Sequence, residues 1–193
     1  MDTITFGHDD ENDPIERIVL EKQGNKALLL SKYILSYNSY NYEYVNITWE
    51  NCNCREWLNS DFMKQNFSQN EQNSLLTTDV INNDNYNNEG GNTTKDKLFL
   101  LSIDEFKKYF NKNSQAIAKH KYDSNHWHRG IWWLRSPGEE QSWAACVTDG
   151  GYLAYEGNYV TVEYGIRPAL WVSLSDTSQN ENSMITSMQD SNN

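Results

Sequence analysis

The chain has 193 residues, enough for one domain of ordinary size with its own core. It carries 27 acidic and 16 basic residues, a formal charge of −11 and no basic run, so nucleic acid is not expected as a ligand. No apolar run approaches the ~20 residues of a membrane helix, so membrane insertion is not expected either. Asparagine occurs 25 times, but aromatic residues reach 13%, which indicates that most of the chain folds.

The N-terminal third predicts strands. Residues 4–6 could open one, and the apolar runs 14–20 and 26–31 flank Gly24-Asn25, which predicts a hairpin. The second run is apolar on both faces and should be covered on both sides. The first six residues lack the basic and apolar regions of a secretory signal. We therefore expect a cytoplasmic chain, or a surface location reached through a trimmed or separate signal.

The middle third predicts helices around one long loop. Thr48 stands at an N-cap position before residues 49–62, where apolar residues follow helical spacing. Ser68 and Glu71 form a capping box for a short second helix. The Asn/Gly-rich stretch 82–95 predicts a surface loop. Leu98–Leu101 then predicts a buried strand, and Ser102-Ile-Asp-Glu105 predicts a helix to about residue 110.

The last third predicts an antiparallel sheet, because period-two alternation is interrupted by glycine turns at short intervals. The predicted strands are 132–135, 143–148, 152–155, 159–164 and 169–174, with turns at Asp149-Gly-Gly151 and Glu156-Gly-Asn158. From residue 175 onward the composition is polar without periodicity, which predicts a disordered tail over 175–193. Residues 1–174 are thus expected to form a single globular α+β domain.

Six sequence blocks and their order along the chain resemble those of the bacterial family catalogued as domain of unknown function 6273. This family is common in gut Firmicutes, and its domain is often appended to secreted or surface proteins. These blocks are Lys26–Tyr33, Thr48–Glu50, Arg55–Asn59, Asp96–Ser102, Trp132–Gly138 and Gly165–Trp171. The resemblance runs from about residue 4 to residue 174. It implies a family membership to which no activity is assigned.

The C-terminal third resembles the end of the C-type-lectin-like fold, as found in sulfatase-modifying-factor proteins and in the variable proteins of diversity-generating retroelements. A tryptophan-rich strand ending in Arg-Ser, a glycine-turned hairpin and Gly165-Ile-Arg167 carry this resemblance. It implies a lectin-like architecture with a mainly antiparallel sheet and two to three short helices. Catalytic sulfatase-modifying-factor proteins use a late cysteine pair, whereas only Cys146 lies there. Variable proteins carry hypervariable positions ahead of a terminal Gly-Phe-Arg.

Several strong sequence signals are expected to be structural. Paired tryptophans bury a large area, and an arginine among them satisfies carbonyls or carboxylates with its planar fork. This set comprises Trp132, Trp133, Arg135, Arg167 and Trp171. Ligand contact by these residues is the alternative. Cys54 and Cys146 are expected to fill core positions, and Cys52-x-Cys54 is too close for ordinary bridging.

Two segments suggest metal ligands. His120, His126 and His128 lie within nine residues, and on a strand the last two would share one face, which permits a zinc site. A polar loop is the alternative, and it is the one we expect. The ligand spacing of a calcium loop is similar to that of Asn85-x-Asn87-x-Glu89-Gly90, with Asp96 at the twelfth position. The segment lacks the first Asp, the last Glu and the flanking helices of such a loop. No cofactor is expected, with calcium and zinc left open.

The region between Pro137 and Gly165 offers the chemistry of recognition. Tyrosine and tryptophan supply rigid amphipathic area, and asparagine supplies adaptable hydrogen bonds. The candidate ligand-binding residues are Glu139, Glu140, Gln141, Trp143, Asp149, Tyr152, Tyr155, Asn158 and Tyr159. Half-buried strand aromatics are the alternative. No nucleophile elbow or phosphate-binding glycine loop occurs, and no catalytic triad can be assembled.

We therefore expect a non-catalytic module that binds a protein or glycan ligand on a rigid scaffold, related in form to retroelement-diversified proteins. The alternatives are a metal-dependent enzyme built on the histidine cluster and a structural component of a phage or secretion particle. The sequence does not indicate an oligomeric state.

Overall fold

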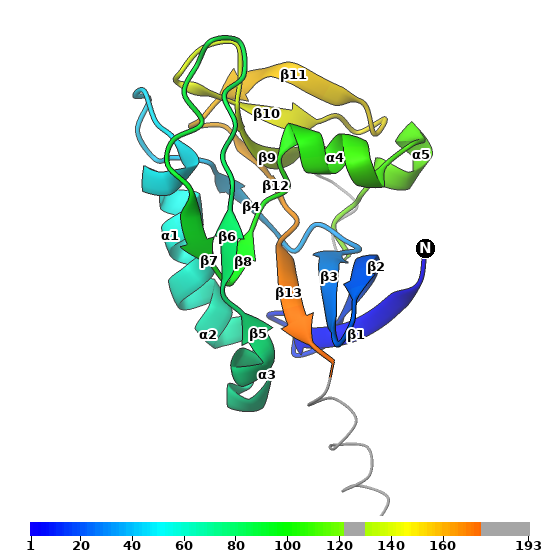
Figure 1. The fold of residues 1–193 in the computed structure, drawn as a ribbon. Helices are drawn as coiled ribbons and strands as arrows, with labels where there is room; N and C mark the ends of the chain where they lie inside the picture. Colours follow the sequence, from blue (N-terminus) through cyan, green and yellow to red (C-terminus); the bar gives the residue numbers. More distant parts are fainter. Residues whose placement is uncertain (122–129, 175–193) are drawn as a thin grey trace, which may run out of the picture.

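The computed structural model describes residues 1–121 and 130–174. One sheet has six strands, in the order β1-β2-β3-β13-β5 with β8 also pairing β13 (Figure 1). Its strands are β1 (Thr3–His8), β2 (Pro14–Gln23), β3 (Lys26–Ser31), β5 (Leu75–Leu76), β8 (Leu98–Phe99) and β13 (Ala169–Ser173). The predicted β2–β3 hairpin is present, and Gly24 adopts a left-handed φ of 59° in its turn. Residues 27–30 of β3 are all buried, as their apolar run predicted.

The second sheet has five strands in the order β11-β10-β9-β12-β4. They are β4 (Ser36–Ser39), β9 (Trp132–Pro137), β10 (Trp143–Val147), β11 (Leu153–Tyr159) and β12 (Glu163–Ile166). The pairing is antiparallel, as predicted, except that β12 runs parallel to β9 with Gly165 opposite Trp132. A separate two-stranded ribbon joins β6 (Thr78–Val80) to β7 (Thr94–Asp96), and a long loop rises from this ribbon toward β10 and β11 (Figure 1).

Short helical segments lie between these strands. They are the 3₁₀ turn Trp49–Asn51, α1 (Asn53–Trp57), the π turn Leu58–Phe62, α2 (Met63–Asn66), α3 (Gln69–Ser74), α4 (Ile103–Tyr109) and α5 (Asn113–Ala116). Both predicted capping boxes are present, Ser68 with Glu71 on α3 and Ser102 with Glu105 on α4. Thr48 makes no side-chain cap bond. Among the described residues, the predicted helix 49–62 is divided by the 3₁₀ and π turns, and α5 is an additional helix that the sequence did not predict.

One hydrophobic core extends from Phe6 to Val172 and joins both sheets to the helices. The molecule is therefore a single α+β domain with a mainly antiparallel sheet. Within the described residues, no helix is long and apolar enough to cross a membrane. The C-type-lectin-like architecture stays a prediction. The predicted tail 175–193 lies outside the described residues.

Two predicted element boundaries are wrong. No turn occurs at residues 156–158, because β11 continues to Tyr159 through a bulge opposite Ala144 and Cys146. Gly157 permits this path with a φ of 71°, since a Cβ there would lie 2.0 Å from the carbonyl oxygen of Ala144. The buried run Leu98–Leu101 is a strand only at Leu98–Phe99, although all four side chains are buried.

Candidate ligand-binding face

An aromatic cluster forms where the β10–β11 hairpin meets the loop after β4. Trp143 of β10 lies directly opposite Tyr159 of β11, with ring centroids 4.9 Å apart. Tyr44 packs edge-on against Tyr159 at 5.3 Å. Tyr44 is 54% exposed and Tyr159 is 46% exposed, whereas Trp143 is half-buried. We call Tyr44, Trp143 and Tyr159 the aromatic cluster.

A hollow of about 470 Å³ is lined by residues that lie close to this cluster along the chain, since Asn46 follows Tyr44 by two positions and Gln141 precedes Trp143 by two. Its lining comes from the loop after β4, the 3₁₀ turn, the β6–β7 loop and the β9–β10 turn, and consists of Asn46, Ile47, Thr48, Asn51, Asn87, Glu89 and Gln141. Two loop residues that are close in sequence to this lining are exposed: Tyr42, four positions before Asn46, at 61%, and Tyr86, which precedes Asn87, at 49%. We call the aromatic cluster and the hollow together the binding face.

Gln141 holds the loops of the binding face together. Its side-chain amide donates to the carbonyl oxygens of Ile47 and Glu89, each over 3.0 Å. Its side-chain oxygen accepts from the backbone N–H of Glu89 over 2.8 Å. The backbone N–H of Ile47 donates to the carbonyl of Gln141 over 3.1 Å. These bonds fix the positions of two long loops relative to the β9–β10 turn.

Most asparagine side chains of the β6–β7 loop donate hydrogen bonds to other residues of the fold. Asn85 and Asn88 donate their amides to the carbonyl oxygens of Pro137 and Gly138, so they attach the loop to the β9–β10 turn. The amide of Asn82 donates to the carbonyl oxygen of Asn92, and the amides of Asn83 and Asn92 donate to the carboxylates of Asp104 and Glu50. Short amide donors that bond carbonyls and carboxylates explain why the segment is rich in asparagine without being loosely attached.

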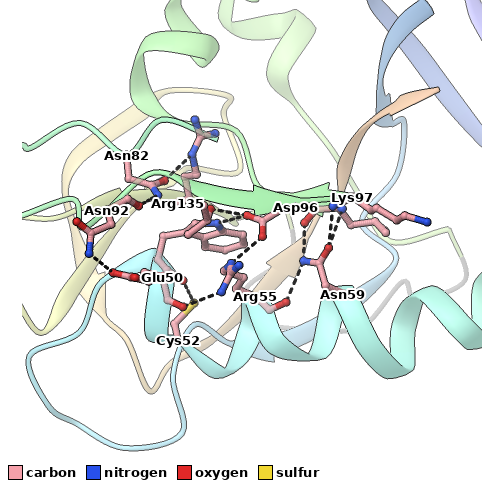
Figure 2. A network of polar contacts seen from close by, with 12 residues as sticks. Glu50, Cys52, Arg55, Asn59, Asn82, Asn92, Asp96, Lys97 and Arg135 are labelled. Atoms are coloured by element: carbon pink, nitrogen blue, oxygen red, sulfur yellow. Dashed lines mark hydrogen bonds and ion pairs between the residues drawn. The ribbon is translucent and has the colours of Figure 1, made fainter. Parts of the chain in front are cut away.

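Beneath this loop, the carboxylate of Asp96 organises a polar network (Figure 2). Its Oδ2 accepts from the indole Nε1 of Trp49 over 3.0 Å and from the hydroxyl of Thr94 over 2.7 Å, and its Oδ1 accepts from Nε of Arg55 over 2.7 Å. Asp96 is 1% exposed. The carboxylate of Asp96 is therefore directed into the fold, where it accepts three hydrogen bonds from Trp49, Thr94 and Arg55.

The same network fixes the neighbouring segments (Figure 2). The Oδ1 of Asn59 accepts from the backbone N–H groups of Lys97 and Leu98, and its amide donates to the carbonyl of Leu98. The Nδ2 of Asn92 donates to Glu50 over 3.0 Å. Residues from three of the sequence blocks described above therefore support the loop that forms one side of the hollow.

Arg135 links β9 to this loop. It is buried, and it donates to the carbonyl oxygens of Leu100 and Ile81, to Oδ1 of Asn82 and to the carboxylate of Glu105. Four of the five N–H donors of this buried guanidinium therefore bond within the fold, which agrees with a structural role.

The remaining residues of the set expected to be structural also make internal contacts. Arg167 lies over the ring of Trp132 at 4.6 Å, and burial lowers its pKa to about 9. The indole N–H groups of Trp132 and Trp133 donate to the carbonyl oxygens of Ala116 and Asn38. Trp171 is only half-buried, and the ammonium of Lys26 lies 5.0 Å from its ring.

The nine candidate ligand-binding residues do not form one site. Gln141, Trp143 and Tyr159 belong to the binding face, and Glu139 and Glu140 are exposed in the adjoining turn. Tyr155 is exposed but lies against Lys107 of α4, and the amide of Asn158 is bonded to the hydroxyl of Tyr164. Asp149 and Tyr152 lie at the opposite, β10–β11 turn end of the hairpin, where Gly151 approaches Asn113 of α5.

The predicted metal ligands are only partly described. His120 stacks on Tyr37 at 5.6 Å and pairs with Ile34, whereas His126 and His128 lie outside the described residues. Within residues 1–121 and 130–174, no group of three or more His, Cys, Asp and Glu side chains is arranged to hold a metal.

All three cysteines are buried and free, which agrees with the core positions expected for Cys54 and Cys146. Burial raises the pKa of the Cys52 and Cys146 thiols to about 12 and that of Cys54 well above its usual value. These side chains are therefore protonated at neutral pH and are unsuited to nucleophilic attack.

Comparison with known protein families assigns the chain to one of them. The family model described as Domain of unknown function (DUF6273) matches residues 24–174. The chain belongs to this family. No curated protein and no solved structure gives a significant match. The DUF6273 match includes the whole binding face and the Asp96 network, whereas β1 and β2 precede it and extend the six-stranded sheet.

The ligand-binding residues predicted from the sequence include only Gln141, Trp143 and Tyr159 of the ten residues that form this face of the DUF6273 domain. Tyr44 and Asn46 were not among the candidates, and Asn87 and Glu89 were considered only as calcium ligands. The signal was present, because residues 40–46 combine tyrosine and asparagine in the same way as the hairpin 152–159. The two segments meet through long-range contacts, because the backbone N–H of Asn41 donates to the carbonyl of Val160 over 2.9 Å and Tyr44 packs on Tyr159. No local sequence pattern indicates these contacts.

Proposed function

We propose that this DUF6273 domain is a non-catalytic ligand-binding module that recognises a protein or a glycan through the binding face. The observation that carries the proposal is the aromatic cluster, in which two tyrosines from separate segments remain about half exposed while packing edge-on. Large, rigid aromatic area with a polar end is typical of recognition surfaces, because it gains contact area at low cost in side-chain entropy.

The hydrogen bonds that hold the loops of the binding face in place favour the same function. Recognition loops bind more tightly when they are already ordered, because less conformational entropy is lost on binding. Here Gln141, Asn85 and Asn88 attach both loops to the β9–β10 turn through side-chain bonds to backbone groups. The C-type-lectin-like architecture and the relation to retroelement-diversified proteins are part of this proposal, in which a rigid scaffold carries variable side chains.

Binding assays with matched variants test the proposal. The wild-type domain, the double variant Tyr44→Ser/Tyr159→Ser and the control Tyr152→Ser are applied to a glycan array and to affinity capture with identification by mass spectrometry. Tyr152 is 62% exposed at the other end of the same hairpin. We expect a ligand that the wild type and the control both bind and that the double variant loses. Turnover of a substrate without any such ligand, or binding that the double variant retains, would contradict the proposal.

A further inference from the structure

The hollow contains three polar side chains that make no hydrogen bond or ion pair with any other described residue. Asn46, Asn87 and Glu89 line it from two loops, and all three are exposed. This differs from the rest of the β6–β7 loop, whose other asparagines donate to acceptors within the fold. Asn87 is therefore the asparagine of the segment 82–92 whose side chain is available to a ligand.

Asn87 is also presented in an unusual backbone conformation. Tyr86 and Asn87 have φ values of 52° and 63°, and Asn85 and Asn88 pair across them through two backbone hydrogen bonds. Asparagine tolerates the left-handed region, but tyrosine is uncommon there and pays a conformational cost. The surrounding bonds hold this tight turn, which presents the unpaired amide of Asn87 in the lining of the hollow.

The charge of the lining restricts the ligand. Glu89 is the one ionisable side chain among the described residues that line the hollow, and no lysine or arginine accompanies it. An anionic group such as a phosphate, sulfate or sialic acid carboxylate would meet this carboxylate without a cation to balance it. The remaining polar groups are amides and a hydroxyl, which offer both donors and acceptors.

We infer that the hollow is a subsite for one neutral sugar residue, whose hydroxyls bond the side chains of Asn46, Asn87 and Glu89. Neighbouring hydroxyls both donate and accept, which matches a lining that holds amides and one carboxylate. The volume of about 470 Å³ is within the roughly 300–1,000 Å³ typical of small-ligand sites. This inference rests on the proposed function and specifies the class of ligand.

The test uses the domain biotinylated and displayed on streptavidin, because multivalent display allows detection of weak single-sugar affinities. The array carries neutral oligosaccharides together with sialylated and sulfated counterparts. We expect the domain to bind neutral glycans. We expect no binding to a sialylated or sulfated form in which the sugar residue that would enter the hollow carries the charge. The best neutral glycan is then titrated against Asn87→Gly, Glu89→Gln and Asn12→Gly.

These variants separate a sugar subsite from a loss of folding. Glycine keeps the left-handed turn at residue 87, and Glu89→Gln keeps the backbone bonds to Gln141. Asn12 has the same φ of 63° in the β1–β2 turn, outside the hollow, and is the matched control. We expect affinity to fall by about fivefold for Asn87→Gly and about tenfold for Glu89→Gln, with no change for Asn12→Gly.

The outcomes distinguish the two proposals. Binding only to anionic glycans, or neutral-glycan binding unchanged in Asn87→Gly and Glu89→Gln, would overturn the sugar subsite. If no glycan binds but a protein ligand is lost on Tyr44→Ser/Tyr159→Ser, the sugar subsite fails while the proposed function stands. If neither ligand class depends on these residues, both proposals fail.

Discussion

Arg55 donates its Nε proton to Oδ1 of Asp96 over 2.7 Å, and the side chain of Asp96 is fully buried at that contact. The two residues come from α1 and β7, 41 positions apart, and the same carboxylate also binds Trp49 and Thr94. A charge in this position stabilises the fold only while its partners are present, because an unpaired buried charge is costly.

Replacing Asp96 by asparagine should destabilise the domain by about 3 kcal/mol, since the amide neither balances Arg55 nor accepts three hydrogen bonds. Urea unfolding followed by tryptophan fluorescence measures the change. The matched control is Asp79→Asn in the neighbouring strand β6, where the carboxylate is exposed and pairs with exposed Lys95. That change should cost less than about 1 kcal/mol. Equal effects of the two substitutions would refute the role assigned to Asp96.

Replacing Gln141 by alanine should loosen both loops of the binding face, because it removes three side-chain hydrogen bonds that join them. We expect faster hydrogen exchange at the amide of Glu89 and a fall of about 1–2 kcal/mol in the free energy of unfolding. The neighbouring change Glu140→Ala, at an exposed position, should leave that exchange unaltered. Unchanged protection of Glu89 in Gln141→Ala would show that the clamp is dispensable.

The carboxylate of Glu21 should give the domain a pH-dependent contribution. Hydrogen bonds from Lys108 of α4, Tyr109 and Gln23 lower its pKa from 4.5 to about 2. Because this pKa is lower in the folded than in the unfolded state, the ionised carboxylate stabilises the protein at pH values above the unfolded pKa of about 4.5. This contribution disappears as the pH falls from about 4.5 toward 2. Because the pair is partly solvated, Glu21→Gln should cost about 1 kcal/mol at pH 7 and less at pH 3.

Urea unfolding at pH 7, 4 and 3 measures this difference, with exposed Glu11→Gln as the control. A penalty for Glu21→Gln that stays constant from pH 7 to pH 3 would contradict the assigned pKa.

The three buried thiols should resist alkylation in the native state. Cys52 and Cys146, with pKa values near 12, and Cys54, whose pKa burial raises well above its usual value, are protonated and covered at pH 8. Iodoacetamide labelling at pH 8, read by intact mass, should modify none of them in minutes and all three in 6 M urea, where unfolding exposes them. Rapid labelling of one cysteine in the folded protein would indicate an exposed, activated thiol.

Local sequence patterns predicted the elements whose stability is local. The capping boxes at Ser68 and Ser102 are self-contained within four residues, and the apolar run of β3 determines its own burial. The predicted turn at 156–158 was wrong because Gly157 serves a close approach between two strands, and a glycine looks the same in either role.

The binding face could be predicted only in part. Trp143 and Tyr159 were candidates because they lie on one hairpin. Tyr44 reaches Tyr159 from 115 positions away, and Asn87 joins the same surface through the contacts of Gln141, Asn85 and Asn88. These associations depend on long-range side-chain bonds to backbone groups, and no spacing rule in a single sequence encodes them.

The most direct measurement of where the ligand binds is NMR of the domain with ¹³C-labelled tyrosine rings, titrated with the glycan or protein that the binding assays identify. Recognition through the binding face predicts that the signals of Tyr44 and Tyr159 shift on saturation while that of Tyr152, at the far end of the hairpin, stays in place. Shifts centred on Tyr152, with Tyr44 and Tyr159 unperturbed, would show that this domain binds its ligand somewhere else.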